Sequence, residues 1–390
     1  MTNQIHPPIY CDNAATSFPK PPGVQEAVAR ALGELGVAAG RGVYRRAQEV
    51  DREIQRTRLA IGRLFNASAS QVVFTQNATG ALNQVLHGFL QPGDHVVTSE
   101  IEHNSVLRPL KWLEEHRGVA VTIVSADRQG IVAVEEIERA VTERTKLVAL
   151  MHASNVTGGV QPIEAVGGIV RKRGLRFLVD AAQTAGYLPI DLGKLPIDFL
   201  ACAGHKGLLG PLGTGVLVIG KGREEELAPL MQGGTGSVSE DPHQPTMMPD
   251  KFESGNLNVP GIMGLGAGVE YLLQPGIEQE RSRLEKLTEL FLAEISECRG
   301  LTVYGPTGAN GRVGVVSLNL EQVDPQTLAT ILDQSFGIEV RSGLHCAPGA
   351  HRACGSFERG GTVRFSFGHF SSEEDVRRAA ESLREIAAQF

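Results

Sequence analysis

The chain has 390 residues, of which 42% are hydrophobic, and 37 Lys and Arg face 44 Asp and Glu, for a formal charge of −7. This composition excludes a disordered chain, and the length suffices for two lobes, because one domain typically has about 100–200 residues. No run of Lys or Arg occurs, so we expect no nucleic acid as a partner, because phosphate binding needs clustered basic side chains.

The N-terminal stretch lacks the basic start and the apolar core of a signal peptide. No later stretch reaches the ~18 apolar residues of a membrane span. The five cysteines are odd in number and scattered, which argues against a disulfide framework. We therefore expect a cytoplasmic protein with reduced thiols and no membrane partner.

Short β-branched runs alternate with helix-like segments from about residue 70, which predicts parallel βαβ units in an α/β fold. The segments 198–204 and 214–220 extend this sheet, and the second is expected to return antiparallel. The large domain is predicted to span residues 15–255. The other predicted strands are 72–75, 95–98, 119–124, 146–152 and 176–180, and the clearest helices are 105–116 and 162–174.

Residues 1–14 and 256–390 are expected to form a smaller α+β domain. A long helical pattern runs to about Cys298, and a final helix is expected to begin with Ser371 as N-cap and Glu374 at its third position. The segment 231–250 reads as a long irregular loop. The predicted strands of this part are 301–305, 313–320, 337–343 and 362–368.

The turn after the strand 72–75 combines small residues with Thr79 at a helix start. Free N–H groups and the helix dipole there suit a phosphate. An ordinary turn capped by Thr79 is the alternative. The turn matches neither a Walker loop nor GxGxxG, which argues against nucleotide triphosphates and dinucleotides.

Asp180 ends a strand that looks buried, where open α/β sheets bind ligands, and Gln183 follows three residues later. Lys206 lies beside His205 among small and apolar residues, where burial disfavours the ammonium form and favours an imine-forming nucleophile. One cofactor, pyridoxal phosphate, requires such a lysine, an acidic partner and a phosphate cup. His103, at another strand end, offers an imidazole that could stack on the cofactor ring.

The segment 337–354 contains Arg341, His345 and Cys346, and Arg364 follows on the next strand. A thiol beside an imidazole and cations has its thiolate favoured, so Cys346 is a candidate nucleophile. Both arginines are candidates for binding a substrate carboxylate through the guanidinium fork.

A Cys/His metal site is the rival interpretation of this loop. The spacing of His345, Cys346, His351 and Cys354 lacks the CxxC pairs usual for structural zinc, so we expect no metal. Cys11, Cys202 and Cys298 read as small buried residues, and for Cys354 the sequence leaves burial open.

These motifs together resemble the class V aminotransferases of fold type I, and within them the SUF-type, or group II, cysteine desulfurases. The resemblance covers nearly the whole chain. It is carried by YCDNAAT (10–16), GRGVYRRA (40–47), SEIEHNSV (99–106), HASNVTGG (152–159), LVDAAQTAG (178–186), AGHKGLLGP (203–211), FESGNLN (252–258), VRSGLHCAP (340–348) and RFSFGHFSSEEDV (364–376).

The resemblance implies a role for each matching residue around the cofactor. Lys206 matches the lysine that forms an imine with pyridoxal phosphate, and Asp180 matches the partner of the ring nitrogen. Gln183 matches the contact to the ring hydroxyl, and His103 matches the catalytic residue that stacks on the ring.

The resemblance also implies which residues bind the phosphate of the cofactor and which lie near its ring and the substrate. Thr79 and His205 match phosphate contacts, and Ala78 stands where a threonine is common. Asn155 matches the asparagine near the ring and the substrate. Because the family is dimeric, Asn256 is implied to reach the phosphate of a neighbouring subunit.

The resemblance makes Arg364 the main carboxylate-binding arginine, with Arg341 ahead of the catalytic Cys346. The chain departs from the family at Ala203, where Ser or Thr is usual, and at Leu344, where a histidine is frequent. Any role of that histidine would fall to His345 or Lys206.

The implied activity converts L-cysteine to L-alanine and leaves a persulfide on Cys346 for an acceptor protein or a small thiol reductant, in a homodimer that serves iron–sulfur cluster assembly. The alternatives are a pyruvate-forming cysteine or cystine C–S lyase, a selenocysteine lyase, and a non-catalytic cofactor-binding protein. The intact Lys206, Asp180 and Cys346 argue against the last.

Overall fold

The structure is a computed structural model that describes residues 7–40 and 42–390. Residues 1–6, which belong to the N-terminal stretch and to the predicted small domain, lie outside it, as does residue 41 in the segment 40–47.

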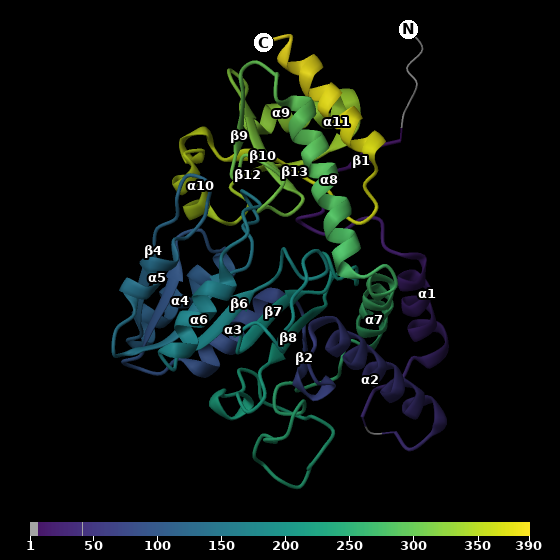
Figure 1. Cartoon of the computed structure of the whole chain (residues 1–390). Coiled ribbons are helices and arrows are strands. Elements are labelled where there is room, and N and C mark those ends of the chain that lie inside the picture. The colour runs from purple at the N-terminus through teal and green to yellow at the C-terminus, as the bar shows by residue number, and fades with distance from the viewer. Residues whose placement is uncertain (1–6, 41) are drawn as a thin grey trace.

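A seven-stranded sheet with the order β2-β8-β7-β6-β5-β3-β4 forms the centre of the larger part (Figure 1). Only β8 runs antiparallel to its neighbours β2 and β7, so the predicted antiparallel return is confirmed. The strands are β2 (Val72–Thr75), β3 (His95–Ser99), β4 (Ala120–Val124), β5 (Thr145–Met151), β6 (Arg176–Asp180), β7 (Phe199–Ala203) and β8 (Gly215–Ile219).

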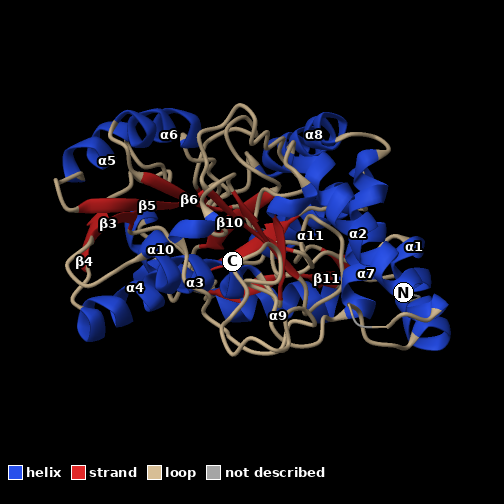
Figure 2. Ribbon diagram, turned by 90° about the horizontal axis from the view of Figure 1, so that it is seen from below, coloured by secondary structure: helices blue, strands red, loops and turns tan. Residues whose placement is uncertain are grey.

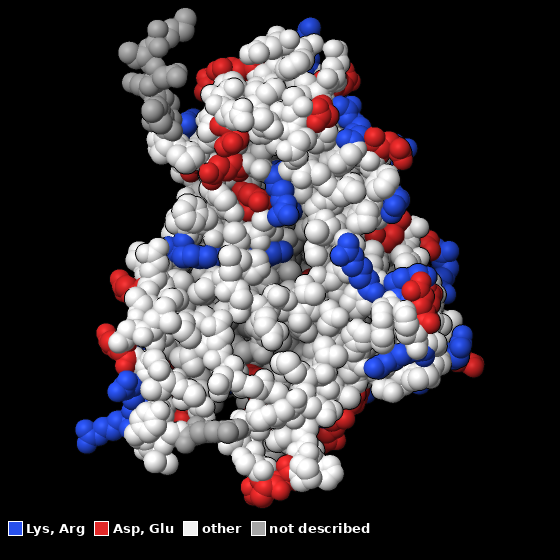
Figure 3. Space-filling view, turned by 180° about the vertical axis from the view of Figure 1, so that it is seen from behind, with Lys and Arg blue, Asp and Glu red and all other residues white. Residues whose placement is uncertain are grey.

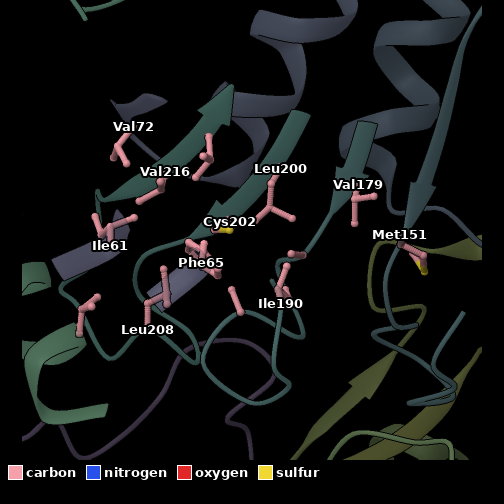
Figure 4. Packing of buried hydrophobic residues seen from close by; sticks show 14 of the residues in the cluster. Ile61, Phe65, Val72, Met151, Val179, Ile190, Leu200, Cys202, Leu208 and Val216 are labelled. Carbon is pink, nitrogen blue, oxygen red and sulfur yellow. The ribbon is translucent and has the colours of Figure 1, made fainter. Parts of the chain in front are cut away.

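Helices cover both faces of this sheet, as expected for βαβ units (Figure 2). α3 (Ala78–Phe89) and α4 (Asn104–Arg117) lie on one face, and α5 (Val134–Ala140) and α6 (Ile163–Lys172) lie on the other. Leu82, Val85 and Leu86 of α3 are buried at helical spacing, and this stripe is what fixes the helix to the sheet. Figure 4 shows the opposite face, where Val179, Leu200, Cys202 and Val216 pack with Phe65.

α1 (Pro22–Arg30), α2 (Arg45–Phe65) and α7 (Val259–Leu273) pack together at one end of the sheet, and a short π-helical turn, Ala31–Leu35, follows α1. α7 approaches its neighbours closely because it is rich in glycine. A Cβ on Gly266 would lie 2.3 Å from the Thr57 hydroxyl of α2, so this contact requires glycine. The predicted irregular loop 231–250 is confirmed, since it contains no helix or strand.

The smaller sheet is antiparallel and has the order β12-β13-β10-β9. A two-stranded pair, β1 with β11, joins the N-terminal segment to it. The elements are β1 (Ile9–Tyr10), α8 (Ile277–Ile295), β9 (Leu301–Tyr304), β10 (Val315–Leu320), α9 (Pro325–Phe336), β11 (Ile338–Glu339), β12 (Arg341–Gly343), α10 (Pro348–Cys354), β13 (Thr362–Ser366) and α11 (Glu373–Ala387).

Two local expectations need correction. The helical pattern up to Cys298 divides into α7 and α8, because Pro275 cannot continue a helix and Gly276 adopts φ +83°. The last helix begins one residue late, with Ser372 as N-cap and Asp375 at its third position. The hydroxyl of Ser371 instead accepts a hydrogen bond from the Gly368 N–H (2.9 Å).

The domain boundary at residue 255 stays a prediction. In the structure α7, which follows this boundary, contributes Ile262, Leu265 and Val269 to the core of the larger part. Within the described residues, no helix is both long and apolar enough to cross a membrane. Figure 3 shows basic and acidic side chains interspersed over one face of the molecule.

Candidate active site

A cavity of about 180 Å³ lies at the carboxyl ends of the parallel strands, where open α/β sheets bind their ligands. The register of β5, β6 and β7 brings residues of three strands to this edge, because Met151, Asp180 and Ala201 lie side by side there. The lining includes Asn77, Ala78, Thr79, His103, Ser105, Met151, Asn155, Asp180, Gln183, Ala203, His205 and Lys206. One site therefore collects most of the predicted cofactor residues from five separate loops.

Lys206 and Asp180 are the two charged groups of this cavity. Burial lowers the pKa of Lys206 to about 8, and the nearby Asp180 carboxylate opposes this shift. Burial raises the pKa of Asp180, against the Ala182 N–H that donates to its carboxylate (2.9 Å) and the charge of Lys206. Roughly a tenth of Lys206 is thus a free amine at pH 7, far more than for an exposed lysine, and the Asp180 carboxylate gains by pairing with a cation.

Side-chain contacts hold the backbone around Lys206. The His205 carbonyl accepts hydrogen bonds from Lys20 Nζ (2.7 Å) and Thr16 Oγ1 (3.0 Å), and the Lys206 carbonyl accepts one from Ser17 Oγ (2.8 Å). The His205 Nδ1 is buried without a partner, and burial, followed by the charges of Lys206 and Lys20, lowers the pKa of this imidazole to about 4. His205 is therefore neutral and can hydrogen-bond a ligand in the cavity.

A chain of hydrogen bonds links the start of α3 to the start of α4. Thr79 Oγ1 lies 2.7 Å from Ser105 Oγ, which lies 2.8 Å from His103 Nδ1. The Ser105 N–H donates to this same Nδ1 (3.0 Å), so Nδ1 is an acceptor and the proton of the neutral ring resides on Nε2. Burial, followed by the charge of Lys206, lowers the pKa of His103 to about 4.

Thr79 does not cap its helix, contrary to the alternative interpretation of the turn. Asn77 is the N-cap of α3, and its side-chain oxygen accepts from the Gly80 N–H (2.9 Å). The hydroxyl of Thr79 is therefore directed to Ser105 at the cavity. Gln183 donates its amide to the Ala14 carbonyl (3.0 Å), which leaves its side-chain oxygen for other partners.

Arg364 lies 2% exposed beside the cavity, and Arg341 is its antiparallel neighbour in register. Arg364 Nη2 donates to Asp12 (2.6 Å), and Nη1 donates to the Asn155 carbonyl (3.2 Å). Its buried Nε has no partner. Because a guanidinium carries five donors, this arginine retains N–H groups for a carboxylate.

Cys346 is exposed, and it lines a second hollow together with Thr79, His103 and Ser105, next to the cavity. Its carbonyl accepts from the Asn104 N–H (2.9 Å) at the start of α4, adjacent to His103. His345 and Cys346 adopt the unusual left-handed φ values of +49° and +59°. Cys346 therefore lies on a strained turn, in a hollow that shares Thr79, His103 and Ser105 with the cavity.

The His345 ring points into the protein. Its Nε2 lies 3.1 Å from Thr362 Oγ1, and its Nδ1 is buried without a partner. Burial, followed by the charge of Arg364, holds the pKa of His345 well below its usual range. The predicted role of His345 in catalysis stays a prediction, and a neutral ring in this position is suited to shaping the loop.

His351 and Cys354 belong to the short helix α10. The His351 Nδ1 lies 2.7 Å from Ser356 Oγ, and the Cys354 sulfur lies 3.2 Å from the same hydroxyl. Among residues 7–40 and 42–390, no group of three or more His, Cys, Asp or Glu side chains could hold a metal ion. Cys11 and Cys202 are buried as predicted, but Cys298 is only half-buried because it lies in the loop after α8.

Asn256 lies apart from this cavity, in a separate hollow of about 360 Å³ with Gln76, Glu253 and Asn258. Three contacts at the site were not anticipated from the sequence. Ser105 follows His103 by two residues, and only the fold places its hydroxyl between His103 and Thr79. Asp12 lies in the YCDNAAT segment, but its pairing with Arg364 spans 352 residues. The third is the Asn104 N–H that holds Cys346.

A buried lysine of lowered pKa near a buried carboxylate, at the carboxyl edge of a mostly parallel sheet, is typical of an enzyme that binds a carbonyl compound as an imine. The comparisons with known proteins agree with this class. Residues 9–379 match the model of the family "Aminotransferase class-V", and the chain belongs to this family.

The relatives are similar over nearly their full lengths. The chain is 40% identical to a probable cysteine desulfurase from Methanothermobacter thermautotrophicus, with 97% of this chain and 94% of the relative covered. It superposes on the apo structure of a cysteine desulfurase from Thermococcus onnurineus NA1 with a TM-score of 0.92 and 34% identity, covering 98% and 95% of the two chains. A cysteine desulfurase from Escherichia coli gives a TM-score of 0.87 at 29% identity, with the same coverage. The predicted fold class is thereby confirmed.

Proposed function

We propose that this chain is a pyridoxal phosphate-dependent cysteine desulfurase of the SUF type. The observation that carries this proposal is the position of Cys346, which presents an exposed thiol beside the cavity of Lys206 and Asp180. Relatives with 30–40% identity over nearly the whole chain are named cysteine desulfurases or probable cysteine desulfurases, which supports the same activity.

The cavity fits pyridoxal phosphate. Asn155 Oδ1 and His205 Nδ1 are buried there without partners, which is costly unless a polar ligand satisfies them. The start of α3 and the hydroxyls of Thr79 and Ser105 suit the phosphate, and Asp180 suits the protonated ring nitrogen. Ala78 and Ala203 line the cavity without a hydroxyl, so main-chain N–H groups and Ser105 take a larger share of phosphate binding here.

When bound, the cofactor supplies an electron sink for the substrate's α-carbon. Arg364, assisted by Arg341, binds the carboxylate of L-cysteine, and Gln183 and His103 contact the cofactor ring. The free amine of Lys206 takes the α-proton, for which its lowered pKa suits it. These residues thereby orient the substrate with its sulfur toward Cys346.

The Cys346 thiolate then attacks the substrate sulfur. A sulfur–sulfur bond forms as the carbon–sulfur bond breaks, and the bonding electron pair stays with the carbon, which is protonated as alanine forms. The enzyme is left with a persulfide on Cys346. An acceptor protein or a small thiol reductant removes this sulfur, as iron–sulfur cluster assembly requires.

We infer that the protein works as a cytoplasmic homodimer. Large apolar side chains remain exposed on the single chain, among them Phe18, Leu32, Val43 and Leu212. A second copy would cover such side chains, and Asn256 would reach the phosphate of the neighbouring subunit.

The product of L-cysteine turnover under reducing conditions tests the proposal, with Cys346→Ala run beside the unchanged enzyme. We expect alanine and sulfide, and a loss of alanine formation of at least about a hundredfold in the variant, because the nucleophile is gone. The variant should retain the absorbance of the bound cofactor. Pyruvate and ammonia at an unchanged rate in the variant would instead identify a C–S lyase, and preference for selenocysteine would identify a selenocysteine lyase.

A further inference from the structure

Asn155 contacts three parts of the site at once. Its side-chain nitrogen donates to the His345 carbonyl (2.6 Å), in the turn that carries Cys346. Its main-chain carbonyl accepts from Arg364 Nη1 (3.2 Å). Its side-chain oxygen is buried without a partner, and the residue belongs to the lining of the cavity. Because the amide is planar, a ligand that binds the side-chain oxygen also fixes the direction of the nitrogen that donates to the His345 carbonyl.

The turn held by Asn155 is under backbone strain. His345 and Cys346 both adopt left-handed φ values, which residues with a Cβ rarely do in succession. Such a conformation persists only where the surroundings impose it. The Asn155 amide holds the His345 carbonyl, and the Asn104 N–H holds the Cys346 carbonyl, so two neighbouring carbonyls are each restrained by one hydrogen bond.

The two restraints differ in their response to a ligand. The Asn104 N–H belongs to the backbone of α4 and is fixed by that helix. The Asn155 side chain can rotate, its side-chain oxygen has no partner, and the residue lines the cavity. A donor in the cavity that bonds this oxygen would fix the amide plane and keep its nitrogen aimed at the His345 carbonyl.

We propose that Asn155 is a positioning residue for Cys346, and that it couples occupation of the cavity to the order of the turn 344–347. This inference rests on the proposed function, because it assigns the bound group to the cofactor or substrate beside Asn155. In the empty site the amide restrains the turn weakly, and with the cofactor bound it restrains the turn firmly. The thiol is then presented in one place when the substrate sulfur arrives.

Amide hydrogen exchange of the full chain, read by mass spectrometry on peptides covering 102–106 and 342–348, tests this coupling. Addition of pyridoxal phosphate to the cofactor-free protein should slow exchange in both peptides. Asn155→Asp keeps an oxygen toward the cavity but replaces the donor to His345 with an acceptor. In this variant exchange should be about tenfold faster in the loaded protein, as expected for the loss of one hydrogen bond.

Asn155→Ala removes the amide without adding a charge. If Asn155→Asp does not fold, the same exchange measurement on Asn155→Ala tests the coupling. Asn310→Asp is the matched control, because Asn310 is exposed and lies in the connection between β9 and β10, outside both peptides. This control should exchange like the unchanged protein. Exchange at 342–348 that is the same with and without cofactor, or the same in Asn155→Ala as in the unchanged chain, would overturn the proposal. A chain that made no alanine from cysteine would refute the proposed function while leaving this measurement intact.

Discussion

At the scale of single residues, burial favours the uncharged forms of the basic side chains that line the cavity. Lys206 is partly a free amine, and His103 and His205 remain uncharged. Burial is the first cause in each case, because taking a cation out of water disfavours it. The site is thus set up for proton transfer and imine formation by its low exposure.

The shifted pKa of Lys206 predicts how capture of pyridoxal phosphate depends on pH. The amine is the nucleophile, so the rate of capture by cofactor-free protein should rise with pH and level off above about 8, where Lys206 has lost its proton. Cofactor absorbance after rapid mixing measures this rate. A rise that continued toward the usual lysine pKa of about 10.4 would contradict the burial argument. Lys206→Ala should abolish covalent capture.

From the buried Glu102 carboxyl we expect the free energy of unfolding to depend on pH. This fully buried carboxyl accepts from Ser99 Oγ (2.5 Å) and the Met151 N–H (3.1 Å), and burial raises its pKa to about 8. The folded chain therefore binds a proton that the unfolded chain has released above its own pKa of about 4.3. The stability contributed by this group is present at low pH and falls as pH rises from about 5 to 8, by roughly 1.4 kcal/mol per pH unit.

Glu102→Gln measures this contribution, because the amide keeps an acceptor for both donors and cannot ionise. The free energy of unfolding in urea should fall more steeply between pH 5 and 8 in the unchanged chain than in the variant. Equal slopes in the two proteins would show that the Glu102 carboxyl is not protonated in the folded state.

At the scale of elements, a buried ion pair fixes the irregular segment before α7. Glu253 accepts from Arg58 of α2 (2.9 Å) and from the Phe74 N–H of β2 (2.6 Å), and both side chains of the ion pair are 4% exposed. The Arg58 guanidinium also lies 4.4 Å from the centre of the Phe74 ring. Helix, strand and loop are therefore joined at one carboxylate.

Glu253→Gln should lower the free energy of unfolding by about 3–5 kcal/mol, because it leaves the buried Arg58 charge without its counter-ion. Denaturant unfolding with an unchanged m-value measures this. The matched control is Glu270→Gln, which breaks the exposed Arg63–Glu270 pair and should change stability by less than about 1 kcal/mol. A similar, small effect in both variants would show that the buried pair is not a structural anchor.

At the scale of the whole molecule, the two sheets meet at the site. Arg364 on β13 of the smaller sheet bonds Asp12 of the N-terminal segment and the Asn155 carbonyl after β5 of the larger sheet. The contacts of one guanidinium thus tie together segments from both ends of the chain. Under the proposed function, placement of the substrate carboxylate at Arg364 therefore depends on how the two sheets pack together.

The proposed dimer predicts a solution mass twice that of the single chain of 41.7 kDa, since 2 × 41.7 is 83.4 kDa. Analytical ultracentrifugation measures this mass. Val43 is 91% exposed in the single chain, and we expect the second copy to cover it, so Val43→Glu should weaken association without lowering the stability of the monomer. A species of single-chain mass in the unchanged protein at micromolar concentration would refute the dimer.

The sequence by itself determined the order along the chain of the strands of the larger sheet, because hydrophobic spacing and the Gly and Pro residues at turns are local properties. The run VVFT, for example, is β2 to the residue, and the antiparallel return of β8 agrees with the Gly- and Pro-rich connection 204–214 that precedes it. The sequence was less reliable at element ends. Pro275 and Gly276 split one helical pattern, and Ser371 and Ser372 compete for one N-cap.

Only the tertiary structure decided which side chains meet, because contacts across hundreds of residues leave no local pattern. Motif order indicated Lys206, Asp180 and Cys346, but it gave no sign that Asp12 pairs with Arg364 or that Asn155 holds the His345 carbonyl. It also left the direction of the His345 ring open, and packing turns that ring toward Thr362. Chemistry can be predicted from residue types in order, whereas positioning depends on burial and on hydrogen bonds that exist only in the folded chain.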